Sequence, residues 1–534
     1  SNQMTCGEAL MKLLEKYGVD TVFGMPGEHT LTLYQGIANS NIKHIQIRNE
    51  QGAGFMADGY ARVSGKPGVC TLISGPGVTN AATAMGQAYA DSIPMLIISS
   101  VTSTYTLGKG WGCLHEVTDQ QAVTAPLTAL SATALSPEDL PELIGQAYAI
   151  FESSRPRPVH ISIPVDVLSM MTDGDWEPRK TPSRPMPNPT DIQAAVELLA
   201  QAKRPIICVG GGALKANEAL TVLAEQLNAS VLSSNAGKGV VPESHPLSLG
   251  GSIWRAPAQN YLAKADTILA IGTELSETDS FIERLDLNGK LIRVDIDPSK
   301  INDLYPADVG IVADAQATAE ALLTTLQAQG ISNVGVNTAQ EVSAVREELM
   351  SEVNAVEAQH LKILVSLRQA MPADTVIMGD ITQLVYTGSF AMPVDQPSCW
   401  HYPAGYCALG PGLPMAVGAK VAEPDRPVVV IAGDGGFMFT VQELATAAEL
   451  GLNLPIILWE NDGLGQIREG MDNRNIPHVG VTYRNPDFVA MAKAFGCYGV
   501  RPNSLAELEA AVTEAFKADM PTMINIYQDS EWLV

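Results

Sequence analysis

The sequence has 534 residues, of which 46% are hydrophobic and 17% are charged, as in an ordinary globular protein. Its formal net charge of −25 argues against nucleic acid or an anionic membrane surface as a partner. No apolar run reaches the roughly 18 residues of a membrane span, and the N-terminus shows no basic-then-apolar signal pattern, so we expect a cytoplasmic protein. The seven cysteines are scattered and form no CxxC pair, which indicates neither a disulfide framework nor a zinc site.

The chain divides into three successive α/β blocks. Domains typically have about 150 residues, so a chain of this length suggests three domains. In the first block, strand-like runs such as "GVCTLISGPG" and "RPVHISIP" alternate with helical patterns such as "GEALMKLLEKYG". Such alternation predicts a parallel sheet covered by helices. A Pro-rich stretch, "TPSRPMPNPTD", indicates a linker after this block.

The second block contains the strand-like runs "RPIICVGGG", "DTILAIG" and "GKLIRVDIDP". The third contains "DTVIMGD", "RPVVVIAGDGG", "NLPIILWEND" and "TMINIYQ". Between them, residues 331–359 show no strand pattern, so we expect a connecting helix and loop there. The sequence thus predicts three doubly wound parallel-sheet domains, at residues 1–172, 188–330 and 358–534.

Two polar residues follow neighbouring buried runs of the third block. Asp434 comes directly after "PVVVIAG", and Asn461 ends "PIILWEN". Because a single right-handed crossover joins two such strands, both side chains should meet at the carboxyl edge of the sheet. A carboxylate, an amide oxygen and backbone carbonyls suit Mg²⁺, and the Gly435 and Gly436 amides could face phosphate oxygens. Taken alone, a glycine-rich loop could equally be an ordinary turn.

The pattern "GDGGF", 27 residues from Asp434 to Asn461, then "NDGLG", is similar to the cofactor motif of the thiamine diphosphate enzymes. The likeness extends over nearly the whole chain: "IRNEQGAGFMADGYAR" and "LISGPGVTNAATAMGQAYADSIPML" resemble the pyrimidine-binding domain of the acetolactate synthase and 2-oxoacid decarboxylase group. The second and third blocks are similar to its middle and diphosphate-binding domains. The resemblance implies thiamine diphosphate and Mg²⁺ as cofactors, with the metal held by Asp434, Asn461 and the carbonyl of Gly463.

The resemblance also assigns the remaining cofactor contacts. Leu409 takes the place of the bulky side chain that bends the cofactor into a V shape, and Cys407 stands where the family usually has glycine. Gln383 matches a residue that contacts the diphosphate. The full set of cofactor contacts expected in this way is Pro26, Glu50, Gln383, Cys407, Leu409, Gly433, Asp434, Gly435, Gly436, Asn461, Gly463 and Leu464.

Glu50 is the expected carboxylic acid that faces N1′ of the cofactor pyrimidine and makes its 4′-imino group a base. It follows the strand-like run "HIQIRN", opens a helix and lies beside the small residues Gly52, Ala53 and Gly54. Without the resemblance, a glutamate in a first helical turn would also simply suit the helix dipole.

Departures from the synthase pattern indicate the reaction. Thr278 replaces the arginine that binds the acceptor carboxylate, and Gly470 replaces a pocket-shaping tryptophan. Glu28 stands where related decarboxylases have an acid that assists protonation, and His115 aligns with a glutamine near the substrate. We therefore expect Glu50, Glu28 and His115 to be catalytic in a non-oxidative 2-oxoacid decarboxylase, a carbon–carbon lyase that forms an aldehyde.

A larger and more anionic pocket favours a long, cationic 2-oxo acid. Among relatives, the chain most resembles the 5-guanidino-2-oxopentanoate decarboxylases of arginine catabolism, notably in "PGEHTL", "LHEVTDQ" and "DITQLVY". Glu277, Asp279 and Glu469 are candidate partners of the guanidinium group, together with Glu28. Each could instead be a solvated surface acid.

The alternative function is an acetolactate synthase-like carboligase that acts on pyruvate. FAD is not expected, because "SLGGSIWRAP" stands where flavin-containing relatives have a "GMHG" stretch. In this family different subunits hold the two ends of one cofactor, so the resemblance implies a homodimer or homotetramer with active sites at the subunit interface. The expected partner is a small 2-oxo acid, with no nucleic acid and no membrane.

Overall fold

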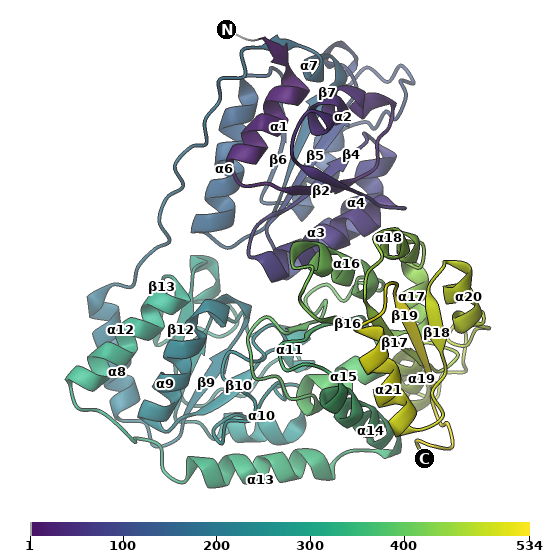
Figure 1. Ribbon diagram of the computed structural model, residues 1–534. Coiled ribbons are helices and arrows are strands. Elements are labelled where there is room, and N and C mark those ends of the chain that lie inside the picture. Colours follow the sequence, from purple (N-terminus) through teal and green to yellow (C-terminus); the bar gives the residue numbers. More distant parts are fainter. Residues whose placement is uncertain (1–2) are drawn as a thin grey trace.

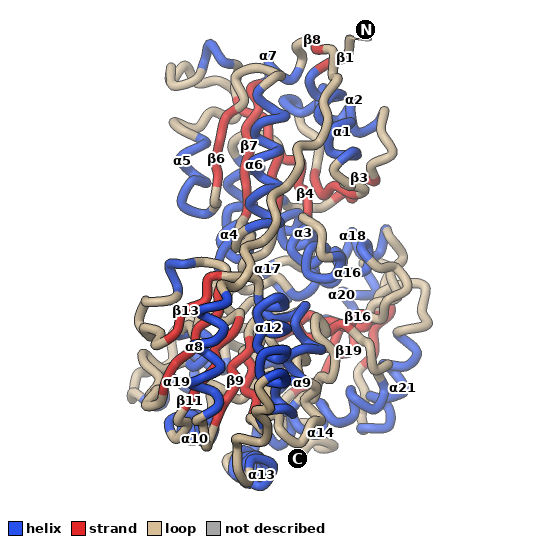
Figure 2. The backbone as a smooth tube through the Cα atoms, turned by 90° about the vertical axis from the view of Figure 1, so that its left-hand side faces the viewer, coloured by secondary structure: helices blue, strands red, loops and turns tan. Residues whose placement is uncertain are grey.

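The computed structural model describes residues 3–534 and divides into three regions, each built on one parallel sheet (Figure 1). In Figure 1 the first region lies above the other two, which lie side by side, and an extended segment after residue 172 joins the first region to the second (Figures 1 and 2). The predicted α/β class with three parallel sheets is confirmed. The exact domain limits, 1–172, 188–330 and 358–534, stay a prediction.

The first sheet has the strand order β3-β2-β4-β5-β7-β6. Its strands are β2 (Thr21–Gly24), β3 (Lys43–Gln46), β4 (Gly68–Leu72), β5 (Met95–Val101), β6 (Leu130–Thr133) and β7 (Pro158–Pro164). The helices are α1 (Cys6–Lys16), α2 (Leu31–Ala38), α3 (Glu50–Ser64), α4 (Pro76–Ala90), α5 (Gln120–Thr124), α6 (Asp139–Ser153) and α7 (Val165–Leu168). A short antiparallel pair, β1 (Met4–Thr5) with β8 (Met171–Thr172), brings the two ends of this region together.

The second sheet has the order β10-β9-β11-β12-β13. Its strands are β9 (Pro205–Val209), β10 (Ser230–Ser233), β11 (Thr267–Ile271), β12 (Lys290–Asp295) and β13 (Val309–Val312). The helices are α8 (Pro189–Ala200), α9 (Asn217–Leu227), α10 (Ala256–Ala263), α11 (Glu277–Ser280) and α12 (Ala315–Ala328). The connection expected at residues 331–359 contains α13 (Thr338–Ser351) and no strand, as predicted.

The third sheet has the order β15-β14-β16-β17-β19-β18. Its strands are β14 (Val376–Gly379), β15 (Trp400–His401), β16 (Val428–Gly433), β17 (Pro455–Glu460), β18 (Tyr498–Val500) and β19 (Thr522–Tyr527). The helices are α14 (Ala355–Ala370), α15 (Gln383–Ala391), α16 (Gly412–Ala422), α17 (Asp434–Phe439), α18 (Glu443–Glu449), α19 (Gly465–Asn473), α20 (Phe488–Ala494) and α21 (Leu505–Ala515).

The strands that the sequence pattern missed are short or lie at sheet edges. β6, β13, β15 and β18 have two to four residues each and are not continuous apolar runs. The central strands β9, β16 and β17 are buried along their whole length and read directly as apolar runs. The glycine-rich stretch at Asp434 also differs from the expected loop, because it forms the helix α17.

The first and third regions meet where helix α3 crosses helix α16. A Cβ atom on Gly59 of α3 would lie 2.0 Å from the carbonyl oxygen of Met415, and one on Gly418 of α16 would lie 1.9 Å from the carbonyl oxygen of Met56. Neither glycine has room for any side chain, so the two helices touch through their backbones. One hydrophobic core continues across this contact, from Phe55 and Met85 in the first region to Leu413 and Phe437 in the third.

Candidate active site

Asp434 lies at the carboxyl end of β16, beside the point where the strand order of the third sheet reverses between β14 and β16. Crevices at such points are where open α/β sheets bind ligands. Asp434 is 2% exposed, and five hydrogen-bond donors surround its carboxylate. They are the backbone amides of Gly435 (2.7 Å), Asn461 (3.0 Å) and Asp462 (2.9 Å), the hydroxyl of Tyr483 (2.9 Å) and the side-chain amide of Asn485 (2.8 Å).

Asn461 follows β17 and converges on Asp434, as the strand pattern predicts. The backbone amide of Asn461 donates to Asp434 Oδ2, and its side-chain nitrogen lies 3.5 Å from Gln383 Oε1. Gly463 pairs with Thr482 in an isolated antiparallel bridge, and the amide of Leu464 donates to the carbonyl of Val481 at 2.9 Å. The turn after β17 is therefore held by the segment 481–485 as well as by Asp434.

Glycines keep this edge of the sheet open. A Cβ atom on Gly433 would lie 2.8 Å from Thr382 Oγ1, and one on Gly435 would lie 2.7 Å from Tyr483 Oη. On Gly465, where α19 begins, it would lie 2.7 Å from Asn461 Nδ2. Backbone can thus approach a ligand at positions where any larger residue would displace polar side chains.

Asp380, which follows β14, is a site residue that the sequence reasoning missed. It is buried and accepts hydrogen bonds from the amides of Ile381 (2.7 Å), Gly410 (3.1 Å) and Gly412 (2.9 Å). Burial raises the pKa of its carboxyl group, although these amides oppose the shift. Asp380 therefore fixes the loop that carries Cys407 and Leu409 to the end of β14.

Cys407 and Leu409 lie on this loop, and both are half-buried. Cys407 has φ +55°, a left-handed conformation that favours glycine, which explains why relatives can have glycine at this position. The amide of Ala408, between the two residues, lies 3.4 Å from Gln87 Oε1 of the first region.

Glu50 is the first residue of α3 and follows β3, at the carboxyl edge of the first sheet. Its Oε1 accepts a hydrogen bond from Asn80 Nδ2 at 3.1 Å. Gly77, in the first turn of α4, lies close to the carboxylate, since a Cβ atom there would lie 3.5 Å from Glu50 Oε2. That Glu50 faces the flat ring of the cofactor stays a prediction.

Glu28 and His115 lie at this same edge, near the strand-order reversal between β2 and β4. Glu28 is exposed and begins a short 3-10 helix, Glu28–Thr30, while Pro26 is exposed just before it. The rings of His29 and His115 meet edge to face with centroids 5.7 Å apart. His29 Nδ1 lies 2.7 Å from Ser74 Oγ, and burial together with His115 lowers the pKa of His29.

The three candidate substrate acids lie on the other two regions. Glu277 is exposed at the start of α11, and Glu469 is exposed on α19, whereas Asp279 is held in a capping box with Ser276. Burial raises the pKa of Asp279 to about 6. Asp279 is thus less available to a cationic ligand than Glu277 or Glu469.

The two exposed acids are on elements that adjoin the third-region site. The ring of Phe281, at the end of α11, meets Tyr386 of α15 with centroids 6.2 Å apart, and α15 begins at Gln383. α19 begins at Gly465, beside the side chain of Asn461. The nearby Glu274 is already paired with Lys300 at 3.4 Å and with Arg155 at 3.6 Å.

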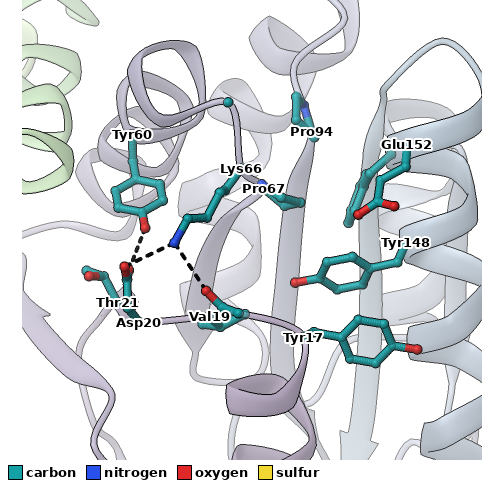
Figure 3. Close-up of a pocket in the computed structure, with 13 residues that line it drawn as sticks. Tyr17, Val19, Asp20, Thr21, Tyr60, Lys66, Pro67, Pro94, Tyr148 and Glu152 are labelled. Atoms are coloured by element: carbon teal, nitrogen blue, oxygen red, sulfur yellow. Dashed lines mark hydrogen bonds and ion pairs between the residues drawn. The ribbon is translucent and has the colours of Figure 1, made fainter. Parts of the chain in front are cut away.

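A pocket of about 130 Å³ lies at the amino-terminal ends of the strands of the first sheet (Figure 3). It is lined by residues that precede β2, β4 and β5, among them Asp20 and Lys66, which form an ion pair at 3.2 Å. The catalytic candidates follow the carboxyl ends of these strands, so this pocket is separate from them. No helix within residues 3–534 is both long and apolar enough to cross a membrane.

Three family models of thiamine pyrophosphate enzymes match the chain. The N-terminal TPP binding domain matches residues 4–123, the central domain residues 192–322 and the C-terminal TPP binding domain residues 380–526. The chain belongs to the thiamine pyrophosphate enzymes. Its cofactor is thiamine diphosphate, as predicted, and its relatives match it over almost their whole length.

A probable 2-ketoarginine decarboxylase, AruI, of Pseudomonas aeruginosa is 52% identical over 526 residues, which is 98% of this chain and 94% of the relative. A probable acetolactate synthase large subunit of Methanococcus aeolicus is 33% identical over 98% of the chain and 92% of the relative. The acetolactate synthase isozyme 1 large subunit of Escherichia coli is 31% identical over 99% and 95%.

The side chains present suit the cofactor of a thiamine pyrophosphate enzyme. At the carboxyl end of the third sheet, Asp434 and Asn461 lie next to each other beside a run of glycines, and their side chains carry oxygen atoms of the kind that Mg²⁺ prefers. At the carboxyl end of the first sheet, Glu50 lies beside the small residues that a planar ring requires. Of the side chains around Asp434, sequence reasoning missed Tyr483 and Asn485, which lie 49 and 51 residues further along the chain.

Proposed function

We propose that this thiamine pyrophosphate enzyme decarboxylates 2-ketoarginine, that is 5-guanidino-2-oxopentanoate, to 4-guanidinobutanal and CO₂. The observation that carries the proposal is 52% identity over 98% of the chain to a probable 2-ketoarginine decarboxylase. The presence of Glu50, Asp434 and Asn461 after strands of the first and third sheets supports it.

The roles of the residues follow from their positions. When bound, the cofactor supplies the electron sink for the carbanion left by loss of CO₂. Asp434, Asn461 and the carbonyl of Gly463 would hold Mg²⁺ and through it the diphosphate, with Gly433, Gly435, Gly436, Gln383 and Leu464 around them. Glu50 would hold a proton at N1′ of the pyrimidine, and Pro26, Cys407 and Leu409 would contact the cofactor.

Protonation of the product carbon requires an acid beside the reacting centre. Glu28 and His115 are the candidates at the same sheet edge as Glu50. Glu28 is exposed, so it can exchange protons with solvent, and His115 lies against the ring of His29. Proton transfer to carbon releases an aldehyde, whereas attack on a second 2-oxo acid would give a carboligase product.

Specificity for a cationic tail would come from Glu277 and Glu469. A guanidinium group can form a bidentate pair with a carboxylate, and such a charge-assisted contact is strongest where water is excluded. Asp279, on the same short helix as Glu277, adds negative charge only when it is ionised, and burial raises its pKa to about 6.

The test is CO₂ release by the purified protein with thiamine diphosphate and Mg²⁺, comparing 2-ketoarginine, an uncharged branched-chain 2-oxo acid and pyruvate. We expect the highest kcat/KM for 2-ketoarginine, with a loss of about 10²–10⁴-fold in kcat for Glu50→Gln. Formation of acetolactate from pyruvate, with no turnover of 2-ketoarginine, would overturn the proposal in favour of the carboligase.

We further propose that two copies combine so that Glu50 of one faces Asp434 of the other. Glu50→Gln and Asp434→Asn chains, each inactive alone, would then form mixed dimers with one intact site. Co-expression should restore about a quarter of wild-type activity if the chains assort randomly. No restoration would place both residues of one site on a single chain.

A further inference from the structure

The carboxylate of Glu443, in the first turn of α18, binds the backbone directly before Glu50. Its Oε1 accepts the amide hydrogen of Arg48 at 2.9 Å, and its Oε2 accepts that of Asn49 at 3.1 Å. Asn49 is the N-cap of α3, and Glu50 is the next residue. A side chain of the third region therefore holds the turn that aims Glu50.

The contact is close enough to require glycine at position 52. A Cβ atom on Gly52 would lie 2.4 Å from Glu443 Cδ and 2.7 Å from Oε2. On the same side of α18, the hydroxyl of Thr446 donates to the carbonyl of Gln46, the last residue of β3, at 2.9 Å. The segment from the end of β3 to the second turn of α3 is thus fixed at several points by α18.

Glu443 is fully buried, and this burial raises the pKa of its carboxyl group to about 7. Burial of a carboxyl group is unfavourable unless polar groups compensate. The amides of Arg48 and Asn49 provide this compensation. Because they lie at the start of α3, the positive end of the helix dipole also favours the carboxylate. By contrast, the side chain of Glu449 at the other end of α18 is 56% exposed and forms an ion pair with the Arg48 side chain at 3.3 Å. Such a surface ion pair contributes little to stability.

We propose that Glu443 is a positioning residue that sets the orientation of Glu50 toward the cofactor pyrimidine. The proposal rests on the proposed role of Glu50. Because both carboxylate oxygens of Glu443 accept hydrogen bonds from the backbone amides of Arg48 and Asn49, Glu443 acts through this turn. Displacement of this turn moves the carboxylate that has to meet N1′, and misplacement by about 1 Å is enough to cost about 10²-fold in rate.

The main test is Glu443→Gln, which keeps the shape of the side chain but presents an NH₂ group to one of the two backbone amides. We expect kcat to fall about 10–100-fold while KM stays within about twofold. Hydrogen–deuterium exchange at C2 of bound thiamine diphosphate should slow by a similar factor, and calorimetric titration should show several-fold weaker cofactor binding.

The matched control is Glu449→Gln on the same helix, which should leave all three quantities within about twofold of wild type. If Glu443→Gln lowers the melting temperature but leaves kcat and C2 exchange unchanged in the folded protein, Glu443 is only structural and the proposal is wrong. C2 exchange needs no substrate, so a wrong substrate assignment would not affect this result. If Glu50→Gln leaves C2 exchange unchanged, the role of Glu50 is wrong and the positioning proposal falls with it.

A double-mutant cycle with Gly52 gives an independent test. Gly52→Ala alone should slow C2 exchange, because its methyl group pushes the Glu443 carboxylate away from the amides. In a Glu443→Ala background the space is already empty, so Gly52→Ala should have little further effect. Additive effects of the two substitutions on C2 exchange would contradict the proposed contact.

Discussion

The hydroxyl of Tyr483 donates to Asp434 Oδ1 at 2.9 Å, linking a segment outside the sheet to a buried carboxylate at its edge. Burial and the neighbouring Asp434 raise the pKa of Tyr483, so the phenol stays protonated and remains a donor at neutral pH. Asp434 is therefore oriented by its surroundings before any ligand binds.

Tyr483→Phe should destabilise the third region of the cofactor-free protein. Removal of a donor from a buried charged acceptor costs about 1.5–3 kcal/mol, which for a unit of this size is a decrease of about 3–10 °C in the melting temperature. Tyr498→Phe is the control, because Tyr498 makes the same kind of bond to Asp519 at 2.7 Å but is 50% exposed. Equal effects in the two variants, measured by calorimetry, would argue against a special role for the Tyr483 bond.

Gly436→Ala should damage both stability and cofactor binding. The added methyl group would lie 2.5 Å from Asp380 Oδ1, and Asp380 is fixed by three backbone amides. We expect about 1–3 kcal/mol of destabilisation from overpacking. Gly470→Ala on α19 is the control, since nothing lies within 4 Å of its Cβ position. Thermal melts and calorimetric titration with thiamine diphosphate would distinguish the two.

Glu469→Gln should raise KM for 2-ketoarginine about tenfold, which corresponds to about 1.4 kcal/mol, with little change for an uncharged 2-oxo acid. Glu277→Gln should have the same selective effect if both acids contact the guanidinium group. Steady-state kinetics with both substrates check this. A parallel change in KM for the two substrates would show that the carboxylate does not recognise the cationic tail.

Burial of neutral His160 should make the folded state less stable in mild acid. His160 is buried between Ser99 (2.6 Å) and Thr124 (2.7 Å), and burial lowers its pKa from 6.5 to about 4. Between pH 6.5 and 4 the unfolded chain binds a proton that the folded chain does not, so stability falls as pH decreases. The contribution of this group is about 2 kcal/mol between pH 6.5 and 5.

The measurement is the melting temperature at pH 7, 6 and 5 for the wild type and His160→Gln. The variant should lose less stability on acidification, because it has no imidazole to protonate. His478→Gln is the control, since His478 is exposed and pairs with Asp472. A wild-type slope retained in His160→Gln would show that other groups dominate the acid response.

The sequence predicted those parts of the site that are encoded locally. Asp434 and Asn461 each follow a buried apolar strand, and Glu50 follows the partly buried edge strand β3. Because strand ends in a parallel sheet converge, the places of these residues could be inferred from the strand patterns. The resemblance to thiamine diphosphate enzymes added the cofactor, which the family comparison confirms.

The remainder depends on contacts between distant segments. Glu443 reads as one polar position on an amphipathic helix, and its partners Arg48 and Asn49 lie 395 and 394 residues away. Tyr483 follows no strand and belongs to no motif. Asp380 follows a predicted strand, but two of its three amide partners, Gly410 and Gly412, come from a loop 30 and 32 residues later. No sequence periodicity connects such positions, because only the folded structure brings them together.

The backbone contact between α3 and α16 limits how this enzyme can admit a substrate. Gly59 and Gly418 interlock without intervening side chains, and packed surfaces of this kind have few alternative arrangements. Hinge bending between the first and third regions would have to separate them. The helix α19, which carries the exposed Glu469, has no buried residue, so we expect it to move more easily than this helix contact. Movement of α19 would then admit the substrate, and Glu469 on the same helix would help to select it.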